Sequence, residues 1–192
     1  MRHKVSTSSY YSPQELNSFG FKSVGHNVLV SSKSSIYDAH LIELGNNVRI
    51  DDYCCISGNI VLGNHCHVTP FCLLAGGEKG LLVGNYCTFA YRVSVFTQSD
   101  DYFGNSMVNS TIPKKFKNEF KKNISIEDHV IIGANSVVLP GCSLAVGTSV
   151  GACSLVTKST EAWGIYYGSP ARRRGERSKK ILKITSQFEQ II

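Results

Sequence analysis

Two neighbouring aspartates, Asp100 and Asp101, stand in a long polar stretch between two regularly patterned parts of the chain. Together their carboxylates form an anionic patch that would attract a cationic amine. A carboxylate can also orient an amine and accept its proton, which is the work of a general base. The alternative is that both are turn residues, because aspartate often bonds the backbone of its own turn.

Basic residues near the end of the chain form a second group that could do chemistry. They suit a phosphate-rich ligand such as a nucleotide, because Arg and Lys donate charged hydrogen bonds to phosphate oxygens. Nucleic acid is not the expected ligand, since no interleaved aromatic motif accompanies the charges. A solvated helix face is the plainer alternative. The basic residues are Arg172, Arg173, Arg174, Arg177, Lys179, Lys180 and Lys183.

Histidine offers another kind of base. His129 comes three residues after an apolar position and would project from the scaffold beside the polar stretch as it returns. His65 and His67 alternate on one expected strand and would face the same way, so that His40 or His129 would complete a zinc site. The spacing fits zinc poorly and no acidic residue stands in the right place beside them, so no metal is expected.

The elements that must position these groups follow a six-residue period. In residues 126–160 an aliphatic side chain recurs at every sixth position, with a usually small residue four places later. This period fits neither an amphipathic helix nor an alternating strand. It is typical of a hexapeptide β-helix, in which three short strands make one coil. The aliphatic residues expected to point inward are Ile126, Ile132, Val138, Leu144, Val150 and Val156.

The same repeat covers the preceding sequence in three runs that begin at Val24, Leu44 and Val83. The register slips by two residues within 40–44, which predicts a small bulge or loop at a corner. Residues 76–80 are expected to form a protruding turn. Five of the seven cysteines occupy the small-residue position, so we expect them to be buried and structural. They are Cys54, Cys66, Cys72, Cys87 and Cys142.

The repeat breaks between Val95 and Ile126 and then resumes in register. The chain therefore leaves the scaffold, forms a large loop over about residues 97–123, and returns. Loops of this length inside a compact domain are usually functional or disordered, and solenoids place binding sites on such insertions. The loop that carries Asp100 and Asp101 is accordingly the expected site.

Two further segments flank the repeat. Ser12 and Pro13 begin a short predicted helix that ends near Gly20 and would cover the open end of the solenoid. A second helix is expected from about Gly175 to Ile192, with an apolar stripe against a coil or a neighbouring subunit. The expected organisation is an N-terminal extension and cap helix over residues 1–23, the β-helix over 24–160, and a C-terminal tail and helix over 161–192.

The chain has 192 residues, a formal net charge of +6 and 42% hydrophobic residues, which suits one ordinary domain. No apolar run approaches the roughly 18 residues of a membrane-spanning helix. Residues 1–9 are polar and lack the apolar stretch of a secretion signal. We therefore expect a cytoplasmic protein.

The segment ISIEDHVIIGANSVVLPGCSLAVGTSVGACSLVTKSTEAWGIYYGSPARR resembles the C-terminal half of hexapeptide-repeat acyltransferases. The loop SDDYFGNSM and the tail WGIYYGSPARR resemble sugar acetyltransferases of surface-polysaccharide biosynthesis. Those enzymes include N-acetyltransferases of nucleotide-linked 4-amino-4,6-dideoxy sugars. The resemblance covers nearly the whole chain and implies an all-β fold, a left-handed parallel β-helix. It also implies a homotrimer with acetyl-CoA in a groove between two β-helices.

The resemblance further implies which residues meet acetyl-CoA. Ala134 and Ala152 match positions whose backbone faces the pantetheine arm of the cofactor. Thr157 and Lys158 match a threonine–lysine pair near its adenine and phosphate end. Arg172 matches a basic residue near the 3′-phosphate. The alternative is that these basic side chains are simply exposed.

The chain departs from the family pattern at the catalytic position. Sugar O-acetyltransferases of the family carry a histidine shortly after the strand that opens the loop, and Asp100 stands at that place here. Acylation of a hydroxyl needs a base for a group of high pKa, whereas a neutral amine is already a good nucleophile. Asp100, ahead of Asp101, therefore favours an amino sugar as the acceptor.

The expected function is acetyl-CoA-dependent N-acetylation of a nucleotide-linked amino sugar, of the dTDP-4-amino-4,6-dideoxyhexose type. The product would serve surface-polysaccharide biosynthesis. One alternative is a sugar or polysaccharide O-acetyltransferase with His129 as its base. Another is a non-catalytic β-helix scaffold, although a scaffold would not need the basic tail.

Overall fold

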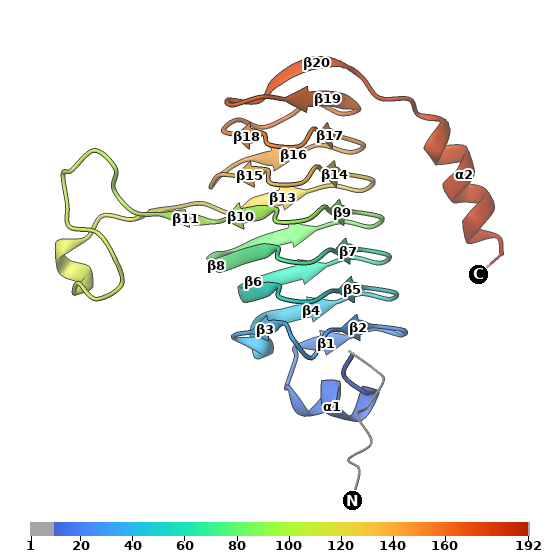
Figure 1. Cartoon of the computed structure of the whole chain (residues 1–192), viewed down its shortest axis with the longest axis horizontal. Helices are drawn as coiled ribbons and strands as arrows, with labels where there is room; N and C mark the ends of the chain where they lie inside the picture. Colours follow the sequence, from blue (N-terminus) through green and yellow to red (C-terminus); the bar gives the residue numbers. More distant parts are fainter. Residues whose placement is uncertain (1–9, 192) are drawn as a thin grey trace, which may run out of the picture.

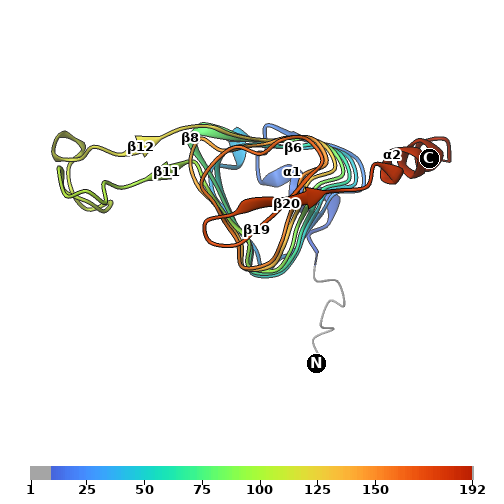
Figure 2. The ribbon, with the colours of Figure 1, turned by 90° about the horizontal axis from the view of Figure 1, so that it is seen from above.

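The computed structural model describes residues 10–191, which form a β-solenoid of about seven turns (Figure 1). Seen along its axis, the solenoid is a triangular prism (Figure 2). Each turn contributes short strands to the three faces, and strands of successive turns pair in parallel. The predicted fold is therefore confirmed. The expectation of an N-terminal extension falls on residues 1–9, outside the described part.

The strands fall into three faces. The first face holds β1 (Ser23–Val24), β4 (Ile42–Leu44), the ends of β6 (Cys55–Leu62) and β8 (Leu73–Val83), β13 (Ile124–Ile126) and β16 (Ser143–Leu144). The second holds β2 (Leu29–Val30), β5 (Arg49–Ile50), β7 (His67–Val68), β9 (Thr88–Phe89), β14 (Ile131–Ile132), β17 (Ser149–Val150), β19 (Gly164–Tyr167) and β20 (Arg172–Glu176). The third holds β3 (Ser35–Ile36), the beginnings of β6 and β8, β10 (Ser94–Phe96), β15 (Val137–Val138) and β18 (Leu155–Val156).

Columns of turns form the three corners of the prism. Corner A joins the first and second faces and includes residues 64–65, 85–86 and 128–129. Corner B joins the second and third faces and includes residues 134–135 and 152–153. Corner C joins the third and first faces and includes residues 139–142, 157–160 and the long loop. A side chain's corner decides which neighbours it can meet.

Inward side chains fill the prism. The six aliphatic residues predicted to point inward between positions 126 and 156 are at most 2% exposed. Phe89 is the largest of the fully buried side chains. All five cysteines predicted to be structural are buried, and the Sγ of Cys66 donates a weak hydrogen bond to the carbonyl of Gly84, 3.1 Å away. The six-residue repeat thus encodes a continuous core of stacked layers.

The predicted cap helix is α1 (Pro13–Ser18). Its N-terminus carries a capping box, in which the Oγ of Ser12 accepts from the backbone N–H of Glu15 and Oε2 of Glu15 accepts from that of Ser12. Leu16 is 4% exposed and joins the core at the open end of the solenoid.

The C-terminal helix α2 (Lys180–Glu189) begins later than predicted. The preceding residues, expected to be a tail and the first turn of the helix, form β19 and the antiparallel strand β20 instead. This hairpin continues the second face beyond β17 and so satisfies backbone groups at its last edge. Among residues 10–191 no helix is long and apolar enough to cross a membrane.

Residues 76–80 are not a protruding turn, as the sequence suggested, but part of β8. The strand bends at corner C and pairs with β6 on both sides of the bend, with irregular register near Gly58 and Gly77. Glycine is needed because a Cβ on Gly76 would lie 2.1 Å from the carbonyl oxygen of Asn59. The register slip predicted near position 40 is the short 3-10 helix η1 (Ala39–Leu41).

Candidate active site

The long loop leaves the solenoid at corner C and projects far from it (Figures 1 and 2). Its stem is the antiparallel pair β11 (Gln98–Ser99) and β12 (Phe120–Lys121). The 3-10 helix η2 (Lys114–Phe116) lies farther out. Thr97 anchors the stem, because its buried hydroxyl donates to the carbonyl of Ala75 at 2.9 Å and its own carbonyl accepts from the N–H of Lys122.

A pocket of about 740 Å³ lies where the loop meets corner C. Loop residues form most of its wall, and Leu139, Pro140 and Thr157 contribute from the solenoid. The structure thus brings together three residues that the sequence singled out for different reasons, Asp100, Asp101 and Thr157.

Asp100 follows β11 directly, and its two carboxylate oxygens have different surroundings. Its Oδ2 accepts a hydrogen bond of 3.2 Å from the backbone N–H of Asn109. Its Oδ1 is buried, accepts no hydrogen bond within residues 10–191, and lies 3.5 Å from the Nζ of Lys117. A buried acceptor of this kind is costly unless something pairs with it. Because Oδ1 is buried while the side chain is 36% exposed, Oδ2 is the oxygen that Asp100 offers to a donating ligand in the pocket.

Asp101 has a different role in the same loop. Its Oδ1 accepts from the backbone N–H of Phe103 at 2.8 Å, and its Oδ2 accepts from the hydroxyl of Ser106 at 3.2 Å. The bond from Phe103, followed by other hydrogen bonds, lowers the pKa of the Asp101 carboxyl. Both oxygens are engaged in shaping the turn, which matches the turn role considered from the sequence.

A charged network behind Asp100 was missed by the sequence analysis. The Nζ of Lys117 lies 2.8 Å from Oε1 of Glu119, and the Nζ of Lys121 lies 3.2 Å from its Oε2. The hydrogen bond to Glu119 raises the pKa of Lys117, and those from Lys117 and Lys121 lower the pKa of Glu119. The run of lysines in the loop was the only signal, and it did not show which lysine turns inward.

His129 does not lie beside the loop in this chain, contrary to the prediction. It occupies corner A with a positive φ of 62°, whereas the loop leaves at corner C. Its ring is stacked on Tyr86 at 5.0 Å between centroids, and it is only 6% exposed. A residue that follows β13 lies at the far end of that strand from the returning loop, and spacing along the chain did not distinguish the two corners.

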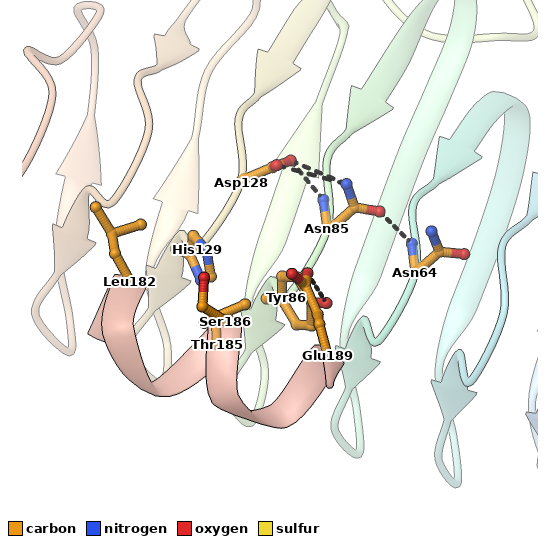
Figure 3. Close-up of a pocket in the computed structure, with 9 residues that line it drawn as sticks. All are labelled: Asn64, Asn85, Tyr86, Asp128, His129, Leu182, Thr185, Ser186 and Glu189. Carbon is orange, nitrogen blue, oxygen red and sulfur yellow. Dashed lines mark hydrogen bonds between the residues drawn. The ribbon is translucent and has the colours of Figure 1, made fainter. Parts of the chain in front are cut away.

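Helix α2 covers His129 and encloses a pocket of about 340 Å³ against corner A (Figure 3). The Nδ1 of His129 is buried there without a partner among the described residues. Phe188 of the helix meets the rings of His65 and Tyr86 edge-on. This contact agrees with the prediction that the helix packs on the outside of a coil.

We expect the contact between α2 and corner A to weaken at high pH. The hydroxyl of Tyr86 donates to Oε1 of Glu189 at 2.6 Å, which raises the pKa of Tyr86 to about 12. The folded-state pKa lies above the ordinary value of about 10, so the contact stabilises fully below pH 10 and is lost towards pH 12. Thermal unfolding of the wild type and Tyr86→Phe should therefore differ at neutral pH and converge above pH 10. A difference that stays constant would contradict this assignment.

The residues expected at acetyl-CoA lie in three places: Thr157 and Lys158 at corner C, Ala134 and Ala152 at corner B, and Arg172 at the start of β20. Lys158 and Arg172 line another pocket, also of about 340 Å³, next to the corner C residue Thr157. Ala134 and Ala152 belong to corner B, where the N–H of Cys153 donates to the carbonyl of Ala134 at 2.8 Å. One subunit therefore does not bring all five residues into a single groove.

His65 and His67 do not face the same way, although the sequence suggested it. His65 is at corner A and stacks on Tyr86, whereas the Nε2 of His67 lies 2.7 Å from Oδ2 of Asp51 on the second face. Residues 10–191 contain no group of three side chains placed to hold a metal ion. The two histidines belong to separate structural contacts.

No family model matches the chain. A dTDP-4-amino-4,6-dideoxy-D-glucose acyltransferase from Escherichia coli is 38% identical over 184 residues, which cover 94% of this chain and 95% of the relative. The chain belongs to the hexapeptide-repeat acyltransferases. This membership confirms the predicted family and makes the protein an enzyme rather than a scaffold.

Two solved structures of a family member, the N-acyltransferase AntD from Bacillus cereus, superpose closely on this acyltransferase. One holds dTDP and 3-hydroxybutyryl-CoA, has a TM-score of 0.94 and 40% identity, and covers 96% of this chain and 98% of AntD. The other, a variant, holds dTDP-4-amino-4,6-dideoxyglucose and coenzyme A, with a TM-score of 0.95 and 39% identity. It covers 97% of this chain and 100% of AntD.

Proposed function

We propose that this acyltransferase moves an acyl group from acyl-CoA to the amino group of a dTDP-4-amino-4,6-dideoxyhexose. The observation that carries the proposal is the similarity, over nearly the whole chain, to enzymes named for or bound to this amino sugar. The pocket at the loop supports it, because the exposed oxygen Oδ2 of Asp100 suits a donating amine. An O-acetyltransferase with His129 as base is disfavoured, since His129 is buried at another corner.

The proposed reaction is direct transfer without a covalent enzyme intermediate. The amine, oriented by Oδ2 of Asp100, attacks the thioester carbonyl, so that a C–N bond forms and the C–S bond breaks. Asp100 accepts the proton that the nitrogen loses, the CoA thiolate leaves, and the proton then passes from Asp100 to the thiolate, which regenerates the carboxylate. Backbone N–H groups stabilise the negative charge on the carbonyl oxygen during the attack. Asp101 keeps the turn that presents Asp100.

We further propose a homotrimer in which acyl-CoA lies between subunits. Ala134 and Ala152 at corner B would face the pantetheine arm, whereas Thr157, Lys158 and Arg172 would hold the adenine and phosphate end. Because Ala134 and Ala152 belong to corner B of one subunit whereas Thr157 and Lys158 belong to its corner C, a groove between two prisms is a simple way to unite them. Lys158 and Arg172 are exposed and cationic, which suits phosphate groups.

The proposal includes a cytoplasmic location and a role in surface-polysaccharide biosynthesis. All seven cysteines lie within the described residues and are free thiols, including Cys55 and Cys153 at the surface. Free thiols are typical of a reducing compartment. No metal takes part in the proposed reaction.

The test is mass spectrometry of reactions that contain the purified enzyme, an acyl-CoA and an acceptor. The donors are acetyl-CoA and 3-hydroxybutyryl-CoA, and the acceptors are dTDP-4-amino-4,6-dideoxyglucose, its 3-amino isomer and the matching hydroxyl sugars. We expect the 4-amino sugar to gain one acyl mass and the hydroxyl sugars to gain none. Acylation of the hydroxyl sugars would overturn the assignment of the acceptor, and the donor that reacts faster identifies the acyl group.

A further inference from the structure

A buried ammonium group lies behind Asp100. The side chain of Lys117 is only 8% exposed, although it belongs to a loop that projects from the solenoid. A cation removed from water in this way is retained only where anions compensate for its lost hydration. The Nζ of Lys117 meets two carboxylates, Glu119 at 2.8 Å and Asp100 at 3.5 Å. Its position is therefore built into the base of the loop.

Two contacts fix the carboxylate of Asp100, and they act on different oxygens. The backbone N–H of Asn109 donates to Oδ2, and the charge of Lys117 attracts Oδ1 from 3.5 Å. Oδ1 is buried and accepts no hydrogen bond from the described residues, so the charge of Lys117 holds it, and Oδ2 is left as the exposed acceptor. Without the lysine, Asp100 and Glu119, which line the same pocket, would repel each other with no other cation of residues 10–191 paired to Asp100.

We propose that Lys117 is a positioning residue for acyl transfer, whose ammonium holds Oδ1 of Asp100 so that Oδ2 faces the acceptor amine. The inference rests on the proposed function, since Lys117 acts only through Asp100. Lys117 itself is not among the residues that line the pocket. It therefore does not need to touch either substrate.

The ion pair with Glu119 allows Lys117 to remain in place throughout the reaction. When Asp100 accepts the proton of the amine, its carboxylate becomes neutral and attracts the ammonium less strongly. Glu119, 2.8 Å from the Nζ, still supplies a negative charge at that stage. Lys121 in turn pairs with the other oxygen of Glu119 at 3.2 Å and with Glu78 at 3.5 Å. The network thus keeps the base oriented between one proton transfer and the next.

A double-mutant cycle tests the proposal. Lys117→Met is expected to lower kcat about 10–100-fold, because a misoriented reacting group costs this much, and to leave the KM for acyl-CoA unchanged. In an Asp100→Asn background, the same substitution should cause no further loss of the residual rate, since its effect passes through Asp100. The residual rate is read by mass spectrometry after long incubation.

The matched control is Lys115→Met. Lys115 lies in the same loop, and its Nζ contacts the ring of Phe116 at 4.9 Å from the centroid rather than a carboxylate. The Lys115→Met substitution removes the same charge as Lys117→Met and should leave kcat at the wild-type value. Lys117→Arg keeps the cation and should retain more activity than Lys117→Met.

Three results would overturn the role of Lys117. They are a wild-type kcat for Lys117→Met, an equal loss in both backgrounds, and an Arg variant as impaired as the Met variant. Thermal unfolding of each variant is the check that the solenoid, from which the loop projects, remains folded. Failure of the proposed function is seen separately, because it requires that the wild-type enzyme leave the amino sugar unmodified.

Discussion

Asp100→Asn is expected to lower kcat for acylation of the amino sugar by about 10²–10⁴-fold, the usual contribution of a general base. The amide keeps the size of the side chain, and its oxygen can still accept the hydrogen bond that Asn109 now donates to Oδ2 at 3.2 Å. It lacks the charge that attracts a cationic amine and the basicity that takes its proton. The KM for acyl-CoA should stay within a few-fold of the wild type, because the cofactor does not depend on this carboxylate. Steady-state kinetics of CoA release measures both constants.

Asp101→Asn is the matched control for this substitution. An asparagine at position 101 can still accept the N–H of Phe103 through its oxygen, so the turn should persist and kcat should change only a few-fold. His129→Asn is a second control, since asparagine tolerates the positive φ of that corner. Full activity in Asp100→Asn, together with loss in His129→Asn, would assign the base to His129 instead.

The double variant Lys158→Ala/Arg172→Ala removes both cations at the proposed phosphate end. It should raise the KM for acyl-CoA at least about tenfold, since charged hydrogen bonds are among the stronger ones. Both residues line one pocket and are exposed in the single subunit, so their removal should leave the solenoid intact. The kcat at saturating acyl-CoA should remain near the wild-type value, because neither residue reaches the loop pocket. The same kinetic assay separates the two constants.

Lys183→Ala controls for the change in net charge. Lys183 belongs to α2, which packs at corner A away from the pocket of Lys158 and Arg172. The Lys183→Ala substitution should therefore leave the KM for acyl-CoA unchanged. A double variant with a wild-type KM would show that the two cations are simply solvated, which is the alternative considered from the sequence.

The two families of variants probe different parts of the site. Asp100 and Lys117 belong to the loop and should alter kcat, whereas Lys158 of corner C and Arg172 of β20 should alter KM. An effect of all four on the same constant would mean that the loop and the pocket of Lys158 and Arg172 meet one ligand group. Whether kcat and KM change separately therefore tests the whole arrangement of the site, as well as the role of each residue.

The sequence by itself determined the solenoid, its inward side chains and the place where the chain leaves it. The reason is that each turn repeats the same local demand, one aliphatic side chain inward and one small side chain near a corner. Ile126, Ile132 and Val138 satisfy it independently of what surrounds them. The cap helix could also be predicted from local sequence, because Ser12 and Glu15 form a capping box within one turn.

Only the tertiary structure decided which corner each polar residue occupies. His129 follows the loop closely in sequence, yet strand β13 lies between them. That strand runs from corner C to corner A, where Tyr86 and α2 bury His129. The hairpin of β19 and β20 was likewise invisible, since it forms by pairing with the edge of β17 rather than by a repeat. Lys117 is the clearest case: its ammonium meets both Asp100 and Glu119 at the stem of the loop, and no spacing along the chain encodes its contact with Asp100.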